Sequence, residues 1–352
     1  MHRTILFLSR FFLSLWLVLI ISFLALLLFN APNVPANTPF ASASIRTQNN
    51  AIIYLPNRIF NCTETAQQFQ CQADIQQDVL ELSLTKGNND SYDLQNCEAQ
   101  YGGQPVSCQN TGETFAPILS KTYEVTALDL SPQQLQAVQR KYQGINTLMQ
   151  LGEVRLFQIS VGLSLVAGIA TAFFTWLHPR LFLSKVFASV AAGFGIHQLV
   201  LYGLGQVRYD AVNAYGLTPG AWDGVVVSTA IATGIITSLA TALLLWQKLN
   251  RPTQILVRIM SSVGIFTLCW LSFNYSFIFG LDTFGSFLPL ESIVTGLAAA
   301  VSVVFAVAAA ILLWSHTHQS LKKFMSLGSG FGAVALTSYL LIYLLLGLGY
   351  AD

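Results

Sequence analysis

Charged residues are scarce in this chain. Only 9% of its 352 residues are Asp, Glu, Lys or Arg, whereas 53% are apolar. Soluble domains usually carry about 25% charged residues. The deficit is expected if much of the chain lies in lipid, where one charge near a helix centre costs about 3 kcal/mol. The composition therefore predicts an integral membrane protein.

The apolar segments also lack the residues that ion-coupled transport and most catalysis require. None carries a central Asp, Glu, Lys or Arg, so the sequence offers no proton relay or cation site. The chain shows neither a phosphate-binding loop nor a catalytic His-Glu or Ser-His constellation. A net charge of +1 gives no basic footprint for nucleic acid. We therefore expect neither an enzyme nor a nucleic-acid-binding protein.

Seven apolar runs are present, one near the N-terminus and six between residues 156 and 348. The later six form three hairpins, each turning just after a tryptophan: Trp176, Trp246 or Trp314. The chain positions of these tryptophans differ by 70 and 68 residues. We predict a mainly α-helical, polytopic fold of seven transmembrane helices, in which the hairpins are an internal repeat. Convergent hydropathy is the alternative explanation of the similarity.

Basic residues gather on one side of these predicted spans. If the N-terminus is cytoplasmic, the acidic residues fall on the opposite, extracytoplasmic side together with the C-terminus. This distribution follows the positive-inside rule and predicts the plasma (inner) membrane, with a bacterium as the source. The predicted cytoplasmic cations are Arg3, Arg10, Arg180, Lys185, Lys248, Arg251, Arg258, Lys322 and Lys323.

The first span, residues 11–29, is an apolar run that follows a basic start. A cleaved signal peptide is the rival interpretation, because residues 41–43 read Ala-Ser-Ala. The run is longer than a usual signal peptide core, so we favour an uncleaved anchor in residues 1–30. Residues 31–44 are rich in Pro, Asn, Ala and Ser and are predicted to be a linker.

Residues 45–150 form a predicted extracytoplasmic domain, and residues 151–352 the six-helix bundle. The domain is rich in Gln, Asn and Thr, and alternating segments such as residues 79–84 and 121–130 predict β-strands. Ser131-Pro132 has the residues of a helix N-terminus. Four of the five cysteines lie here, which indicates an oxidising compartment. Three pairings are possible, and we favour the sequence-local one, Cys62 with Cys71 and Cys97 with Cys108.

Small residues recur at every fourth position in the second, fourth and sixth predicted spans. Such spacing puts them on one helix face, where backbones can approach closely. We therefore predict that these three helices are tightly packed. The positions are Ser164, Gly168 and Ala172; Ala230, Gly234, Ser238 and Ala242; and Ala298, Ser302, Ala306 and Ala310.

Polar residues at one predicted depth of the return helices are the candidate site. They indicate either an outward-facing pocket for a small neutral or quinone-like ligand, or simple interhelical hydrogen bonding. The chain offers no second histidine at this depth that would complete a haem site, so no cofactor or metal is expected. The candidate residues are His197, Gln198, Asn274, Tyr275, Tyr339 and Tyr343.

These patterns predict architecture better than function. We interpret the chain as a scaffold, assembly or accessory component of a membrane complex, which uses its extracytoplasmic domain for recognition. Its expected partners are the lipid bilayer and a membrane or extracytoplasmic protein. A transporter or channel for a small uncharged or lipidic solute is the alternative, and a membrane redox subunit that uses the outer pocket is the second alternative.

Overall fold

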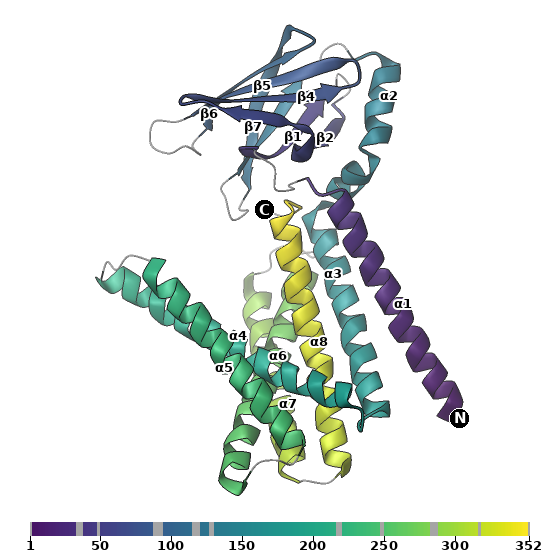
Figure 1. Cartoon of the computed structure of the whole chain (residues 1–352), viewed down its shortest axis with the longest axis vertical. Coiled ribbons are helices and arrows are strands. Elements are labelled where there is room, and N and C mark those ends of the chain that lie inside the picture. The colour runs from purple at the N-terminus through teal and green to yellow at the C-terminus, as the bar shows by residue number, and fades with distance from the viewer. Residues whose placement is uncertain are drawn as a thin grey trace. The chain divides into compact units, whose positions relative to one another are not determined.

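The computed structural model describes the backbone of residues 2–32, 38–47, 50–86, 94–114, 120–126, 130–215, 220–246, 250–281, 288–315 and 318–350, in parts of these ranges without the side chains. These residues form eight α-helices, eight β-strands and one short 3-10 helix. One sheet domain is inserted between α1 and the later helices (Figure 1).

The helices follow the predicted order. Helix α1 covers His2–Phe29 and a short helix, α2, covers Pro132–Lys141. The remaining helices are α3 (Gln143–Leu177), α4 (Phe182–Tyr215), α5 (Gly220–Leu245), α6 (Arg251–Leu281), α7 (Leu288–Trp314) and α8 (His318–Gly347). Long apolar segments become helices because a helix satisfies its own backbone hydrogen bonds where water is absent.

Two helices extend beyond their predicted bounds. Helix α4 continues past the glycines at 203 and 205 to Tyr215, because isolated glycines weaken a helix without ending it. Helix α6 begins at Arg251 instead of Arg258. Pro252 stands in its first turn, where the missing N–H has no helical partner to lose.

Five helical segments in the described part are long and apolar enough to cross a membrane: Gln143–Leu177, Phe182–Gly205, Gly224–Leu245, Arg251–Phe273 and Gln319–Gly347. Two shorter apolar stretches, Leu13–Phe29 and Ala300–Trp314, belong to α1 and α7. As helices, α1 and α7 have 28 and 27 residues. The apolar helices thus support a membrane protein, and the full set of seven spans stays a prediction.

The chain divides into two compact units. The first, called here the helical unit, comprises Met1–Ile20 and Gln158–Leu340. The second, called the half-barrel unit, comprises Ile21–Phe157 and Leu341–Asp352. The half-barrel unit therefore contains the sheet, helix α2, and the nearby ends of three long helices, α1, α3 and α8.

The sheet of the half-barrel unit has eight strands in the order β2-β1-β8-β7-β6-β5-β4-β3. Neighbours are antiparallel except β1 and β8, which are parallel. The strands are β1 (Phe40–Arg46), β2 (Ile52–Pro56), β3 (Asn61–Glu64), β4 (Gln68–Ile75), β5 (Asp78–Lys86), β6 (Leu94–Tyr101), β7 (Gln104–Thr114) and β8 (Ser120–Thr126). The predicted β-rich domain is thus a half-barrel.

Strand β1 begins inside the segment that the sequence indicated as a linker. Its composition of Pro, Ser and Ala hides a buried strand, in which Phe40, Ala43 and Ile45 belong to the core and Ser42 and Ser44 are buried as well. Arg46 on β1 donates two hydrogen bonds to the Glu124 carboxylate on β8, at 2.6 and 2.8 Å. This hydrogen bonding raises the pKa of Arg46 and joins the two parallel strands.

Both predicted disulfides are present. Cys62 on β3 is bonded to Cys71, which is directly opposite on the antiparallel strand β4. Cys97 on β6 is bonded to Cys108 on β7. Strand β7 pairs with β6 only through Val106 and pairs with β8 from Ser107 onward. The second disulfide therefore joins the two strands just beyond the point where their hydrogen-bonded ladder ends.

A two-residue turn of Gly102 and Gly103 connects β6 to β7. Both residues have positive φ, 57° and 77°, as a type I′ hairpin turn requires. Glycine adopts these angles without steric cost, whereas other residues are strained there. The Tyr-Gly-Gly-Gln segment thus sets the register of the hairpin that carries the second disulfide.

Helix α2 begins as the sequence predicts. The Ser131 Oγ atom accepts a hydrogen bond from the Gln134 N–H, and the Gln134 side chain accepts one from the Ser131 N–H, which completes a capping box. Val138 of α2 and Tyr142 and Ile145 beyond it are buried in the core of the half-barrel. This helix therefore closes the inner face of the sheet.

Candidate functional site

Three return helices, α4, α6 and α8, meet in the helical unit. A Cβ atom on Gly195 of α4 would overlap the backbone of Gly264 in α6. A Cβ atom on Gly332 of α8 would overlap Ala191 of α4. The backbones of these helices are thus in direct contact at this level, as small residues permit in membrane bundles.

The third side of this triangle, between α6 and α8, is closed in a similar way. A Cβ atom on Gly328 of α8 would lie 2.8 Å from Ile265 Cδ1 of α6. Ser272 Oγ of α6 donates a hydrogen bond of 3.4 Å to the Phe331 carbonyl of α8. The three helices therefore form a compact centre, and the sequence analysis did not anticipate the role of their glycines.

The outgoing helices pack around this centre along their small-residue faces. Helix α3 lies against α8. A Cβ atom added to Gly330 of α8 would lie only 2.9 Å from the Ala172 Cβ atom of α3. Thr175 and Ser329 share a hydrogen bond of 2.8 Å between their hydroxyls, and Ser326 Oγ donates one of 2.7 Å to the Ala172 carbonyl. The predicted close packing of the second span is thus confirmed, and its partner is the last helix.

Helix α5 lies against α4 in the same manner. A Cβ atom on Gly193 of α4 would overlap Ser238 and Gly234 of α5, and one on Gly234 would lie 2.9 Å from His197 Cβ. Helix α7 contacts α6 through its own row of small residues. Ser302 of that row is fully buried and forms a hydrogen bond with Cys269 of α6. Each outgoing helix therefore packs along a return helix of a neighbouring hairpin.

The tryptophans that end the outgoing helices each face a cation of that neighbouring return helix. The cation lies over the ring in all three cases, at a distance where the negative face of the ring attracts it. The pairs, with the distance from the cation to the ring centroid, are Lys322 over Trp176 (4.5 Å), Lys185 over Trp246 (5.9 Å) and Arg258 over Trp314 (5.6 Å).

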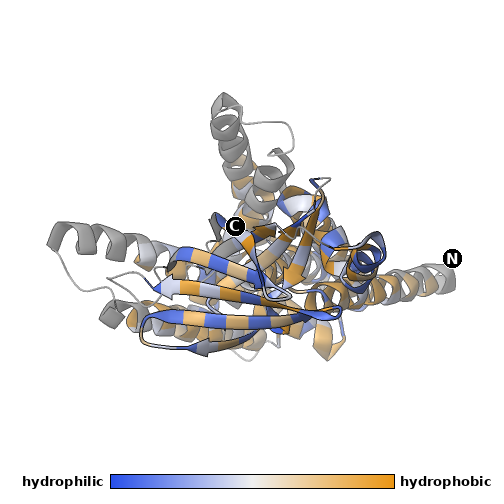
Figure 2. Cartoon of the chain, turned by 90° about the horizontal axis from the view of Figure 1, so that it is seen from above, coloured by the Kyte–Doolittle hydropathy of each residue, from blue (hydrophilic) through white to orange (hydrophobic). Residues whose placement is uncertain are grey.

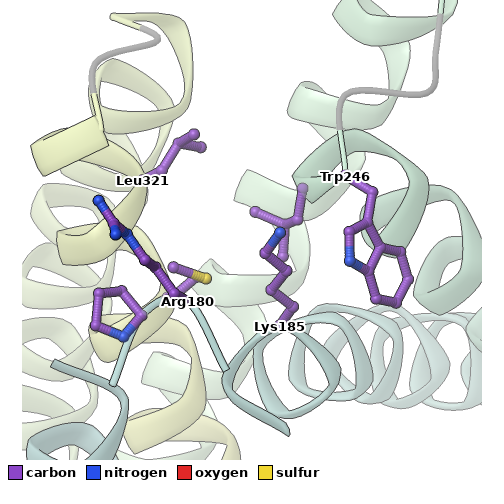
Figure 3. A pocket seen from close by; sticks show the side chains of 7 residues that line it. Arg180, Lys185, Trp246 and Leu321 are labelled. Carbon is purple, nitrogen blue, oxygen red and sulfur yellow. The ribbon is translucent and has the colours of Figure 1, made fainter. Parts of the chain in front are cut away.

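A cavity opens beside one of these pairs, at the end of the helical unit where α4, α6 and α8 begin, called here the basic end. Its volume is about 340 Å³. Arg180 lies in the turn after α3, Lys185 on α4 and Trp246 at the end of α5 (Figure 3). Pro179, Leu245, Leu321 and Met325 complete the lining of this basic cavity.

The charge pattern of the sequence places these cations at the membrane boundary but does not predict that Arg180 and Lys185 line a cavity. The signal was present in the spacing of the three tryptophans and in the basic residues that start the return helices. The cavity forms only where different hairpins pack together, and local sequence patterns do not encode that packing.

The structure brings part of the predicted polar site together. The His197 ring of α4 stacks on the Phe194 ring at a centroid distance of 6.2 Å. The Tyr339 ring of α8 contacts the same Phe194 ring edge to face, also at a centroid distance of 6.2 Å. The two predicted residues are therefore linked by an aromatic ring that the sequence analysis left out. Their surroundings at this level are aromatic as well as polar.

The other predicted site residues are distributed differently. Gln198 is partly buried, and its Nε2 atom has no hydrogen-bond partner among the described residues. Tyr343 is 65% exposed and belongs to the half-barrel unit. The side chains of Asn274 and Tyr275, on α6, lie outside the described residues. The pocket itself therefore stays a prediction.

The outer face of the half-barrel is a second candidate surface. Side chains alternate along the strands, so polar residues face outward while apolar ones enter the core. Figure 2 shows this alternation as bands of colour across the strands. Cross-strand neighbours on the outer face include Gln72, Glu81 and Gln100 in one row and Gln70, Ser83 and Glu98 in the next.

This outer face, defined by those six residues, carries amides, hydroxyls and carboxylates and no cation. Gln72 donates a hydrogen bond of 3.2 Å to Glu81, which leaves the second carboxylate oxygen for other donors. Five of the six are exposed, and Ser83 is partly buried. The face can therefore accept hydrogen bonds from a partner and favours one with basic or amide groups.

The half-barrel is held firmly to the helix ends that share its unit. Asn146 of α3 accepts a hydrogen bond of 2.8 Å from the Tyr54 N–H and donates one of 3.3 Å to the Tyr54 carbonyl, which covers part of the edge strand β2. Arg58 donates to the carbonyl of Phe29 at the end of α1. Tyr350, after α8, donates 3.0 Å to the Leu27 carbonyl of α1.

No protein-family model matches the chain, and no curated protein or solved structure is similar to it.

Proposed function

We propose that this chain is a non-enzymatic integral membrane protein that presents its half-barrel as a recognition surface within a membrane complex. The observation that carries this proposal is that the half-barrel unit combines an exposed polar face with a firm attachment to helices. Its outer face is polar and exposed, while its inner face packs on α2 and the start of α3, its edge strand is hydrogen-bonded to α3, and Arg58 is hydrogen-bonded to the end of α1. A rigidly mounted polar sheet is suited to binding, because little conformational entropy is lost on association.

The orientation that we propose is the one indicated by charge. Seven spans place the N-terminus and the basic end in the cytoplasm and the half-barrel outside, in the plasma membrane of a bacterium. The two disulfides support this arrangement, since they form in oxidising compartments. The similar packing of the three hairpins favours an internal repeat.

Transport of a small uncharged or lipidic solute is less well supported as the function. Direct contacts between α4, α6 and α8 occupy the middle of the bundle where a central path would run. Among the residues that the structure describes, the Gln198 Nε2 atom, which has no hydrogen-bond partner, favours a polar ligand at this depth. A redox role has no corresponding observation in the described part of the chain.

The test of recognition is a charge change on the outer face. We expect the wild-type protein, purified in mild detergent from its own membrane, to elute as a complex with a stoichiometric protein partner. Glu81→Lys places a cation in the centre of the outer face and should weaken that complex at least about tenfold, equivalent to 1.4 kcal/mol. A Gln133→Lys/Gln139→Lys variant makes the same change in net charge on α2 and should leave the complex intact. A monomeric wild-type protein, or equal losses in both variants, would contradict the proposal.

A further inference from the structure

The cations of the basic cavity have no carboxylate near them in the sequence. No Asp or Glu occurs between Glu153 and Asp210, which covers the whole segment carrying Arg180 and Lys185. The end of α5 and the start of α8, which supply the other walls, are equally free of acidic residues. In the described part of the chain neither cation forms an ion pair with a carboxylate, so both are available to an anion from outside the chain.

The shape and lining of the cavity limit the kind of anion. Arg180 and Lys185 come from two different elements, and Figure 3 shows both side chains at the cavity, with the Arg180 nitrogens beside Leu321 and the Lys185 nitrogen nearer Trp246. A guanidinium and an ammonium at one site match the several oxygens of a phosphate group, to which arginine can donate two parallel hydrogen bonds.

Part of the cavity wall is apolar. Leu245 and Met325 are only 5% and 4% exposed, and Leu321 lies beside them. Trp246 stands at the rim, as tryptophan does where membrane meets water. A free phosphate ion would gain nothing from this wall, whereas a lipid acyl chain would bury against it. Charge and apolar surface thus occur together in one cavity.

We propose that the basic cavity is a binding site for an anionic phospholipid, with Arg180 and Lys185 holding the headgroup phosphate and Leu245, Leu321 and Met325 contacting the acyl chain. Because the turn between α3 and α4, helix α4, the end of α5 and the start of α8 all contribute to the walls, a lipid bound here bridges three hairpins. The proposal is independent of the recognition function and would stand if that function failed.

Native mass spectrometry of the full-length protein, released from detergent into increasing amounts of phosphatidylglycerol, tests this site. We expect one tightly bound phosphatidylglycerol in the wild type and markedly weaker binding of phosphatidylcholine. The Arg180→Gln/Lys185→Gln variant should bind phosphatidylglycerol about thirtyfold more weakly, since each cation near an anionic lipid contributes a factor of about five. The Arg251→Gln/Lys323→Gln variant removes the same charge from exposed positions outside the cavity and should bind like wild type.

Three further measurements keep the outcome interpretable. Thermal unfolding should show that both double variants are folded. Inorganic phosphate at millimolar concentration should neither stabilise the protein nor displace the lipid, and displacement would assign the site to a free anion instead. Met325→Trp, which fills the apolar part, should weaken lipid binding while the cations remain. Equal binding of phosphatidylglycerol by the two double variants would overturn the proposal.

Discussion

The Nζ atom of Lys322 lies 4.5 Å from the centroid of the Trp176 ring. This contact joins the beginning of α8, the last helix, to the end of α3. The same relation links α4 to α5 and α6 to α7. Three hairpins that follow one another in the chain are thus connected in a closed ring, in which the last hairpin contacts the first.

A double-mutant cycle on Lys322 and Trp176 should measure this connection. We expect Lys322→Gln and Trp176→Leu to be coupled by about 0.5–2 kcal/mol, because a cation over an aromatic ring at a partly desolvated site contributes that much. Reversible unfolding in detergent gives the four free energies. Lys323→Gln, which changes an exposed neighbour, should show no coupling to Trp176→Leu, and a cycle that closes additively for Lys322 would argue against the contact.

The central helix triangle predicts a sharp difference between two glycines of α4. Gly195→Ala should destabilise the bundle by about 1–3 kcal/mol, because its Cβ would overlap Gly264 and force α4 and α6 apart. Gly203→Ala adds the same atom where nothing lies within 4 Å and should leave stability unchanged or slightly higher. Thermal unfolding of both variants in one detergent decides the matter. Equal melting temperatures would mean that α4 and α6 are not in contact.

The attachment of the half-barrel to α3 can be followed at a single backbone amide. Asn146→Leu removes the acceptor of the Tyr54 N–H hydrogen bond. We expect hydrogen exchange at the Tyr54 amide to become about tenfold faster, which corresponds to a loss of about 1.4 kcal/mol in the free energy of local opening. Thr147→Val is the control, because the Thr147 hydroxyl donates to the Gln143 carbonyl of its own helix and to no strand among the described residues. Unchanged protection of Tyr54 in Asn146→Leu would show that other contacts hold the edge strand.

The disulfides should stabilise the half-barrel and not the bundle. Replacing Cys97 and Cys108 with serine should cost the half-barrel about 2–4 kcal/mol, the range found when short loops lose a disulfide. Cys269→Ala, which removes a buried thiol in α6, should leave half-barrel unfolding unchanged. Chemical denaturation followed by tryptic cleavage within residues 40–126 reports on this unit. A Cys97/Cys108 variant as resistant as wild type would contradict the assignment.

Local features of the fold were predictable from sequence, because each rests on neighbouring residues. The Ser131 capping box, the Gly102-Gly103 turn and the sequence-local disulfides are examples. The stripes of small residues also indicated the packing faces of α3 and α5. In every case the physical cause lies within one turn, one hairpin or one helix face.

Features that depend on distant segments were not predictable in this way. The pairing of α3 with α8, and the parallel pairing of β1 with β8, join residues far apart in the chain. The linker composition around Phe40 concealed a strand whose partner comes much later. The site residues His197 and Tyr339 were selected by depth, yet the ring that connects them, Phe194, is apolar and gave no signal.

Site-specific photo-crosslinking in intact cells tests the central claim most directly. A photoreactive residue at Gln72 or Gln100, on the outer face, should give one discrete adduct with a single protein, lost when Glu81→Lys is added. The same probe at Gln133 or Gln139, on α2, should give none. Recognition by the outer face would be contradicted if the outer-face positions gave no adduct, or if the α2 positions gave the same one.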